Sequence, residues 1–120
     1  MERRAMLFFE EAEEAYAKGC FGFAVFFVEQ AMELLIKYLL AKLVGDYPKA
    51  HKLSLLLSDP SRVMGEGIER LVRENERMLS IVELACIGAR YLDYSYSETI
   101  ARGSLELSRR FLEVVKCEVD

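Results

Sequence analysis

The sequence predicts an all-α protein, an up-and-down bundle of about four long helices with one short extra helix after the second. Three observations predict this fold class. Apolar residues recur every three or four positions through most of the 120 residues, which is the period of a helix packed on a core. Only two prolines and seven glycines interrupt the chain, so long helices are expected. No stretch alternates apolar and polar residues as a strand does.

The first half of the chain predicts two helices. Apolar residues from Ala5 to Tyr16 share one face, and Gly19 marks the end of this helix. The second helix is expected from about Cys20 to Val44 and is apolar around most of its circumference. Its only polar stripe, at i, i+4 and i+8, is formed by Glu29, Gln30, Glu33 and Lys37. A helix this apolar must be covered on several sides, so we expect a second subunit to supply part of the cover.

The second half of the chain predicts the remaining helices. Gly45 to Pro48 breaks the helical pattern, and His51 to Ser58 is expected to form the short helix. A third long helix follows, with apolar residues from Ile68 to Ala89 on one face. The last helix is expected from about Ser97 to Cys117. Ser95-x-x-Glu98 at its start predicts a capping box, in which each side chain satisfies the other's backbone N–H.

Length, charge and hydropathy limit the class of protein. Residues 1–120 are expected to form a single domain, since this length can bury a core of its own. The net charge of −4 argues against bulk attraction to nucleic acid. The longest uncharged run, Gly19 to Val28, has ten residues, whereas a membrane-spanning helix needs about 20. With no cleavable signal pattern at the N-terminus, we expect a cytoplasmic protein that has no membrane partner.

No metal or cofactor is expected from the sequence. The three cysteines, Cys20, Cys86 and Cys117, are widely spaced and form no C-x-x-C pair or Cys/His cluster, so we expect reduced thiols. The paired glutamates lack the Glu-x-x-His motifs of di-iron bundles. The glycines match neither the Walker nor the Rossmann phosphate-binding pattern. No residue is nominated as catalytic.

The arginines of the later helices have two interpretations. Those concerned are Arg70, Arg73, Arg77, Arg102, Arg109 and Arg110. They can form a phosphate-binding strip, or they can pair with glutamates four residues earlier on a solvated helix face. The second interpretation is favoured, because the carboxylates cancel most of the positive field.

The candidate binding site is the junction before the last helix. Arg90, Asp93 and three tyrosines (Tyr91, Tyr94 and Tyr96) lie within seven residues there. A guanidinium can hold a phosphate through two hydrogen bonds, and the tyrosines can stack on bases or donate their hydroxyls. The alternative interpretation pairs Arg90 with Asp93 and makes the tyrosines half-buried connectors.

His51, the one histidine of the chain, follows Pro48 at the start of the expected short helix. A lone histidine can act as a general base or bind an anion when it is protonated. The alternative is a structural role, as a helix cap or a hydrogen-bonding loop residue. The neighbouring sequence offers no nucleophile and no second metal ligand.

Three blocks, in order, resemble the HEPN domain family (higher eukaryotes and prokaryotes nucleotide-binding). Ala12 to Leu40 is similar to the family's second helix, with a Gln-Ala pair followed by Glu and Lys. Pro48 to Leu53 is close to its Pro-x-x-His-x-Leu turn, and Ala89 to Asp93 is similar to its Ala-Arg-Tyr-Pro-Asp junction. The resemblance implies a helical bundle that usually dimerises and works beside nucleotides or RNA. It also implies a nucleotidyltransferase partner, often in a toxin–antitoxin pair.

Many proteins of this resemblance are metal-independent ribonucleases with an Arg-x(4–6)-His motif. Counted from Arg90, the histidine would fall at Ser95, Tyr96 or Ser97, so the usual acid–base group is missing. We therefore expect a homodimer, formed through the second and last helices, that binds a nucleotide, RNA or a nucleotidyltransferase partner near Arg90. The alternatives are a ribonuclease in which Tyr96 or His51 supplies the base, and a purely structural bundle.

Overall fold

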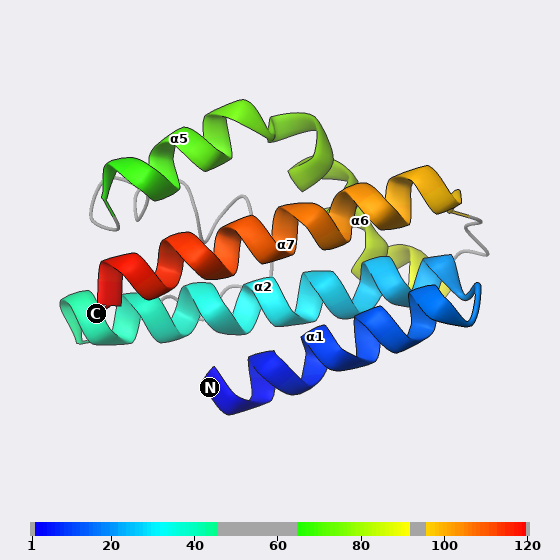
Figure 1. Cartoon of the computed structure of the whole chain (residues 1–120), viewed down its shortest axis with the longest axis horizontal. Helices are drawn as coiled ribbons and strands as arrows, with labels where there is room; N and C mark the ends of the chain where they lie inside the picture. The colour runs from blue at the N-terminus through cyan, green and yellow to red at the C-terminus, as the bar shows by residue number, and fades with distance from the viewer. Residues whose placement is uncertain (1, 46–64, 92–95, 120) are drawn as a thin grey trace.

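The computed structural model describes residues 2–45, 65–91 and 96–119, which form five α-helices (Figure 1). These are α1 (Glu2–Ala17), α2 (Phe21–Val44), α5 (Glu66–Glu74), α6 (Glu76–Tyr91) and α7 (Glu98–Val119). The described ranges contain no strand, and the predicted all-α bundle is confirmed. The short helix expected at residues 51–58 lies outside the described residues.

The central element is α2, which contacts α1, α6 and α7 (Figure 1). Gly19, with a positive φ of 81°, turns the chain between α1 and α2 so that the two helices form an antiparallel pair. In Figure 1, α7 lies along α2 and α5 lies over α7. The start of α7 is held beside the end of α1, so α7 runs in the same direction as α2.

The core is built mainly on one side of α2. Among its largest fully buried side chains are Met32, Leu35, Ile36 and Leu39 of α2, Ile68 of α5, and Leu107 and Phe111 of α7. These positions follow the three- and four-residue spacing that predicted the helices. The predicted end of the second helix is confirmed, because Gly45 adopts φ 82° and its N–H bonds the carbonyl of Ala41.

The third long helix, predicted to be continuous through residues 68–89, is instead two helices that meet at Asn75. Asn75 leaves the helical region, with φ −127° and ψ 28°. Its side-chain Nδ2 donates to the carbonyl of Leu71 at 2.8 Å, so the amide competes with the backbone for a helical acceptor. The chain changes direction there, and α6 passes behind α7 in Figure 1. The apolar spacing continues across the break and does not reveal it.

Candidate functional site

The predicted junction is the connection from α6 to α7. Arg90 lies in the last turn of α6, and nothing is described of its side chain. Asp93, Tyr94 and His51 lie outside the described residues. The structure therefore gives the positions of the two helices that flank the junction, and the pairing of Arg90 with Asp93 stays a prediction.

Tyr96 is the one predicted site residue whose side chain is described. It is half-buried and packs against the hydrophobic core. This agrees with the alternative interpretation, in which the tyrosine is a half-buried connector. The position leaves part of the ring accessible beside the first turn of α7.

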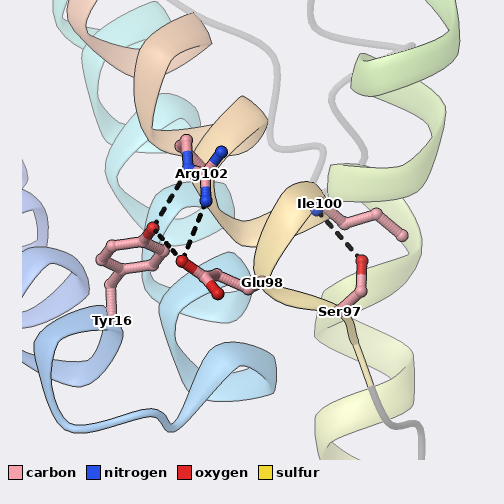
Figure 2. A network of polar contacts seen from close by, with 5 residues as sticks. All are labelled: Tyr16, Ser97, Glu98, Ile100 and Arg102. Atoms are coloured by element: carbon pink, nitrogen blue, oxygen red, sulfur yellow. Dashed lines mark hydrogen bonds and ion pairs between the residues drawn. The ribbon is translucent and has the colours of Figure 1, made fainter.

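The first turn of α7 is capped by Ser97 (Figure 2). The Ile100 backbone N–H donates to Ser97 Oγ at 3.2 Å, which is the usual pairing of an N-cap side chain with the third helical residue. The capping box predicted between Ser95 and Glu98 is therefore wrong in its register: α7 begins at Glu98, and the cap lies two residues later than expected. Ser95 itself lies outside the described residues.

Glu98 instead takes part in a network that ties α7 to α1 (Figure 2). Tyr16, on the last turn of α1, donates its hydroxyl to Glu98 Oε1 at 3.1 Å. Arg102 Nη2 donates to the same oxygen at 2.9 Å, and Arg102 Nε donates to the Tyr16 hydroxyl at 3.2 Å. Each of the three groups thus contacts the other two, which fixes the start of α7 against the end of α1.

The network also sets the charge state of its members. The Arg102 hydrogen bond, followed by that of Tyr16, lowers the pKa of the Glu98 carboxyl. The hydrogen bonds to Tyr16 and Glu98 raise the pKa of the Arg102 guanidinium, which stays charged. One side of the junction is therefore a neutralised ion pair, so an anion entering there meets little net charge from Arg102.

Two other arginines also form ion pairs on the surface. Arg109 of α7 bridges to Glu13 of α1 at 3.3 Å, and Arg70 lies 3.8 Å from Glu66 on α5. Arg109 and Glu13 border a shallow groove between α1 and α7, whose apolar lining includes Met6, Phe9, Leu105 and Leu112. The predicted pairing with a glutamate four residues earlier is supported for Arg70 and Arg102, whereas Arg109 pairs with a glutamate of α1.

A second polar site, formed along the polar stripe of α2, lies inside the bundle. Glu29 and Glu33 are only 1% and 7% exposed. Lys37 Nζ lies 3.0 Å from Glu33 Oε1, and both side chains of this pair are nearly buried. Gln30 Nε2 donates to Glu29 Oε2 at 2.6 Å, whereas the buried Glu29 Oε1 accepts no hydrogen bond.

This environment raises the pKa of Glu29 to about 8. Burial is the largest cause, because a charged carboxylate is poorly solvated inside the bundle. The charge of Glu33, one turn along α2, raises it further, and the charge of Glu83 on α6 adds to the effect. Glu29 therefore keeps its proton at neutral pH and is a carboxylic acid in the folded protein.

Neither a metal site nor a membrane-spanning helix has support among the residues that the structure describes. Within residues 2–45, 65–91 and 96–119, no cluster of three or more His, Cys, Asp or Glu side chains is arranged to hold a metal ion. None of the described helices is long and apolar enough to cross a membrane.

The fold and the junction define a helical bundle of a known class. The family model of the HEPN domain matches residues 2–118, which is nearly the whole chain. The protein therefore belongs to the HEPN domain family, and the resemblance seen in the sequence is confirmed. Comparison with curated proteins gave no match, and comparison with solved structures gave none either.

Sequence reasoning missed two features of this region. The Tyr16 contact to Glu98 joins residues 82 positions apart, and no local pattern signals it. The burial of Glu29 and Glu33 did have a signal. Their stripe is bordered by apolar residues on both sides, so any helix packed on either border also covers part of the stripe.

Proposed function

We propose that this HEPN-domain protein is a homodimer that binds a nucleotide, RNA or a nucleotidyltransferase-domain protein at the α6–α7 junction, without ribonuclease activity. One observation carries the proposal. The chain keeps the arginine of the family's Arg-x(4–6)-His motif as Arg90 but has no histidine at any of the three expected positions. It keeps a group that can hold a phosphate and lacks the group that moves a proton.

The arrangement of the flanking helices supports a binding site there. Arg90 belongs to the last turn of α6, so its backbone is held by helical hydrogen bonds. The other side of the junction is held by the Ser97 cap and by the Tyr16–Glu98–Arg102 network. A site between two anchored helix ends loses less conformational entropy on binding than a site on a long loop.

The remaining residues are poor substitutes for the missing histidine. Tyrosine has an unperturbed pKa of about 10, so Tyr96 would seldom accept a proton near neutral pH. Tyr96 is also half-buried against the core. His51 lies about forty positions earlier in the sequence, outside the described residues. Binding without cleavage is therefore the function that these residues favour.

The experiment compares Arg90→Ala with a matched arginine control. Arg70→Ala removes an exposed arginine from α5, well away from the junction in sequence. Binding of fluorescent nucleotides and of short RNAs is measured by anisotropy for both variants and for the wild type. We expect Arg90→Ala to weaken binding by at least about tenfold, the usual effect of losing a charged hydrogen-bond donor, and Arg70→Ala to leave it unchanged.

RNA cleavage is measured in the same samples. Cleavage that persists in EDTA and is lost in Arg90→Ala would replace this proposal with the alternative, a metal-independent ribonuclease. If Arg90→Ala changes neither binding nor cleavage, the junction is not the site, and a structural role for the bundle is favoured.

The proposed biological setting is a toxin–antitoxin pair with a nucleotidyltransferase-domain protein, as the family resemblance implies. A nucleotidyltransferase reading frame beside the gene would support this setting. The two proteins, expressed together, should then copurify as one complex. Separate elution of the two would leave a nucleotide or RNA as the ligand of the junction.

A further inference from the structure

The shallow groove between α1 and α7 is a second surface, which the proposed function does not use. Its lining positions begin at Met6 on α1 and at Leu105 on α7, and both sets follow the spacing i, i+3, i+4 and i+7. Each wall is therefore about two helical turns long. The two helices run in opposite directions and both pack on α2 (Figure 1). A groove between two such helices has the shape that accepts a third helix.

The floor of the groove is apolar. Phe9 and Leu105 are 8% and 3% exposed, so the core holds their side chains in place, whereas Met6 and Leu112 are half-buried and reach the surface. Ser108, which also lies in the floor, donates its hydroxyl to the Leu105 carbonyl at 2.7 Å. Because this hydrogen bond is made within the chain, the floor offers an occupant mainly apolar contacts.

The size of the groove limits what can enter it. Its volume is about 120 Å³, and an apolar cavity of roughly 150 Å³ accommodates a benzene molecule. One large apolar side chain of a partner can therefore enter, while side chains one turn away lie over Met6 and Leu112. A contact with a single such anchor is small for a protein interface, so we expect a dissociation constant of about 100 μM.

The rim formed by α1 is acidic. Glu10 and Glu13 line the groove, and Glu13 is neutralised by Arg109 at 3.3 Å. Glu10 is exposed and has no ion-pair partner among the residues that the structure describes. Its carboxylate is therefore available to a cation of an occupant.

The rim formed by α7 is acidic beside Arg109 as well. Glu106 and Glu113 lie three residues before and four residues after Arg109, so they are exposed on the same side of the helix. Neither glutamate has an ion-pair partner within the described ranges. The cations of this region lie elsewhere, Arg110 on the side of α7 that contacts α6 and Lys116 one turn past the last lining residue. Carboxylates thus flank the apolar floor on both helices.

We infer that this groove binds an amphipathic helix of another protein, with an apolar stripe at helical spacing and lysines or arginines on both flanks. The central apolar side chain fills the groove, and the flanking cations meet Glu10 on α1 and Glu106 and Glu113 on α7. An extended peptide fits less well, because α1 and α7 have no sheet edge with which a strand could pair. The inference is independent of the proposed ligand at Arg90, which lies before the start of α7.

The probe is a synthetic peptide of about 14 residues, or four helical turns, with leucines on one face and lysines on both flanks. A second peptide has glutamate in place of every lysine. Each is added to isotope-labelled protein, and the backbone amide resonances are followed by NMR. We expect the basic peptide to shift the resonances of residues 6–13 and 105–112 in a saturable way, and the acidic peptide to bind at least about tenfold more weakly. Shifts that do not saturate by about 1 mM, or that lie outside both segments, would overturn the inference.

Glu10→Lys and Glu11→Lys test the acidic rim as a matched pair. Both replace an exposed glutamate of α1 and change the net charge equally, but only Glu10 lines the groove. We expect Glu10→Lys to weaken binding of the basic peptide by at least about fivefold, and Glu11→Lys by less than about twofold. Equal losses would mean that the peptide responds to net charge alone, and the groove would not be its site.

Met6→Gln and Leu7→Gln test the apolar floor in the same manner. Met6 lines the groove, whereas its neighbour Leu7 is 55% exposed and does not. We expect Met6→Gln to weaken binding of the basic peptide by at least about fivefold and Leu7→Gln to leave it unchanged. Circular dichroism should show native helix content in both variants. Unchanged binding by Met6→Gln would overturn the apolar anchor.

Two further measurements separate the groove from other uses of the chain. Met6→Gln should bind nucleotides and RNA like the wild type, so a failure at the groove is distinguishable from a failure at the junction. Light scattering over a range of concentrations should give Glu10→Lys the same mass as the wild type. A homodimer that Glu10→Lys weakens would make the groove an interface between copies and would overturn the inference of a separate partner.

Discussion

The two sides of α2 contrast with each other. Along its polar stripe, the bundle buries Glu29 and the Glu33–Lys37 pair. Elsewhere on the same helix, it exposes Phe23 and part of Phe27. Soluble helices usually do the reverse, with carboxylates in water and phenylalanines in the core. Both positions are therefore unusual for their side chains in a single folded chain.

The physical costs of the two sides differ. Burying an ionisable group costs free energy in the folded monomer itself, and the protein reduces this cost by protonating Glu29 and by pairing Glu33 with Lys37. Exposing phenylalanine costs almost nothing in the monomer and instead leaves apolar surface available for association. Substitutions on the two sides should therefore have very different effects on the free energy of unfolding.

The largest expected effect is the pH dependence that comes from Glu29. Its pKa is about 8 in the folded protein and near 4.5 in the unfolded chain. Between these values the folded state binds more protons, so the free energy of unfolding falls as pH rises, by up to about 1.4 kcal/mol per pH unit. The full contribution is present below pH 4.5 and is lost by the time the pH has passed about 8.

Glu29→Gln tests this dependence, because glutamine has a similar shape and does not titrate. We expect urea unfolding curves at pH 5 and pH 8 to show a difference, wild type minus Glu29→Gln, that changes by about 3.5 kcal/mol. The measurement is made at protein concentrations low enough for the monomer to dominate. Parallel pH profiles of the two proteins would mean that Glu29 is ionised in the fold at neutral pH.

The next largest effect is expected from Lys37→Met, which removes the cation paired with buried Glu33. Breaking a buried ion pair from one side leaves a charge with poor solvation and costs about 3 kcal/mol. Chemical denaturation at pH 7 gives this value. Lys18→Met is the control, because it removes the lysine of an exposed pair with Glu14 and should change stability little. Equal losses for the two variants would mean that the bundle does not bury the α2 pair.

The smallest effect is expected at the exposed Phe23. Phe23→Ser should change the free energy of unfolding of the monomer by less than about 0.5 kcal/mol, since the ring is mostly in water already. Leu39→Ala, on the fully buried side of the same helix, should cost about 3 kcal/mol. Dilute thermal unfolding distinguishes the two. A large loss for Phe23→Ser would show that Phe23 contributes to the stability of the folded chain despite its exposure.

Much of the candidate junction was predictable from the sequence, because its signal is local. The Arg90 block and the missing histidine can be seen directly in the sequence, and the family match over residues 2–118 confirms the family that these residues suggested. The cap was predicted at the right helix but in the wrong register. Ser95 and Ser97 are equally good cap residues, and only the observed start of α7 at Glu98 distinguishes them.

The sequence by itself determined the helical class and most helix ends, since these depend on side-chain period and on glycines such as Gly19 and Gly45, whose positive φ other residues rarely adopt. The tertiary structure alone decided the break at Asn75, the Tyr16–Glu98–Arg102 network, and which side of α2 is covered. The physical reason is that an apolar period shows that a helix packs but not what packs on it. On α2, whose apolar residues extend around most of the circumference, only the packing of its neighbours decided that Glu29 and Glu33 would be buried and Phe23 exposed.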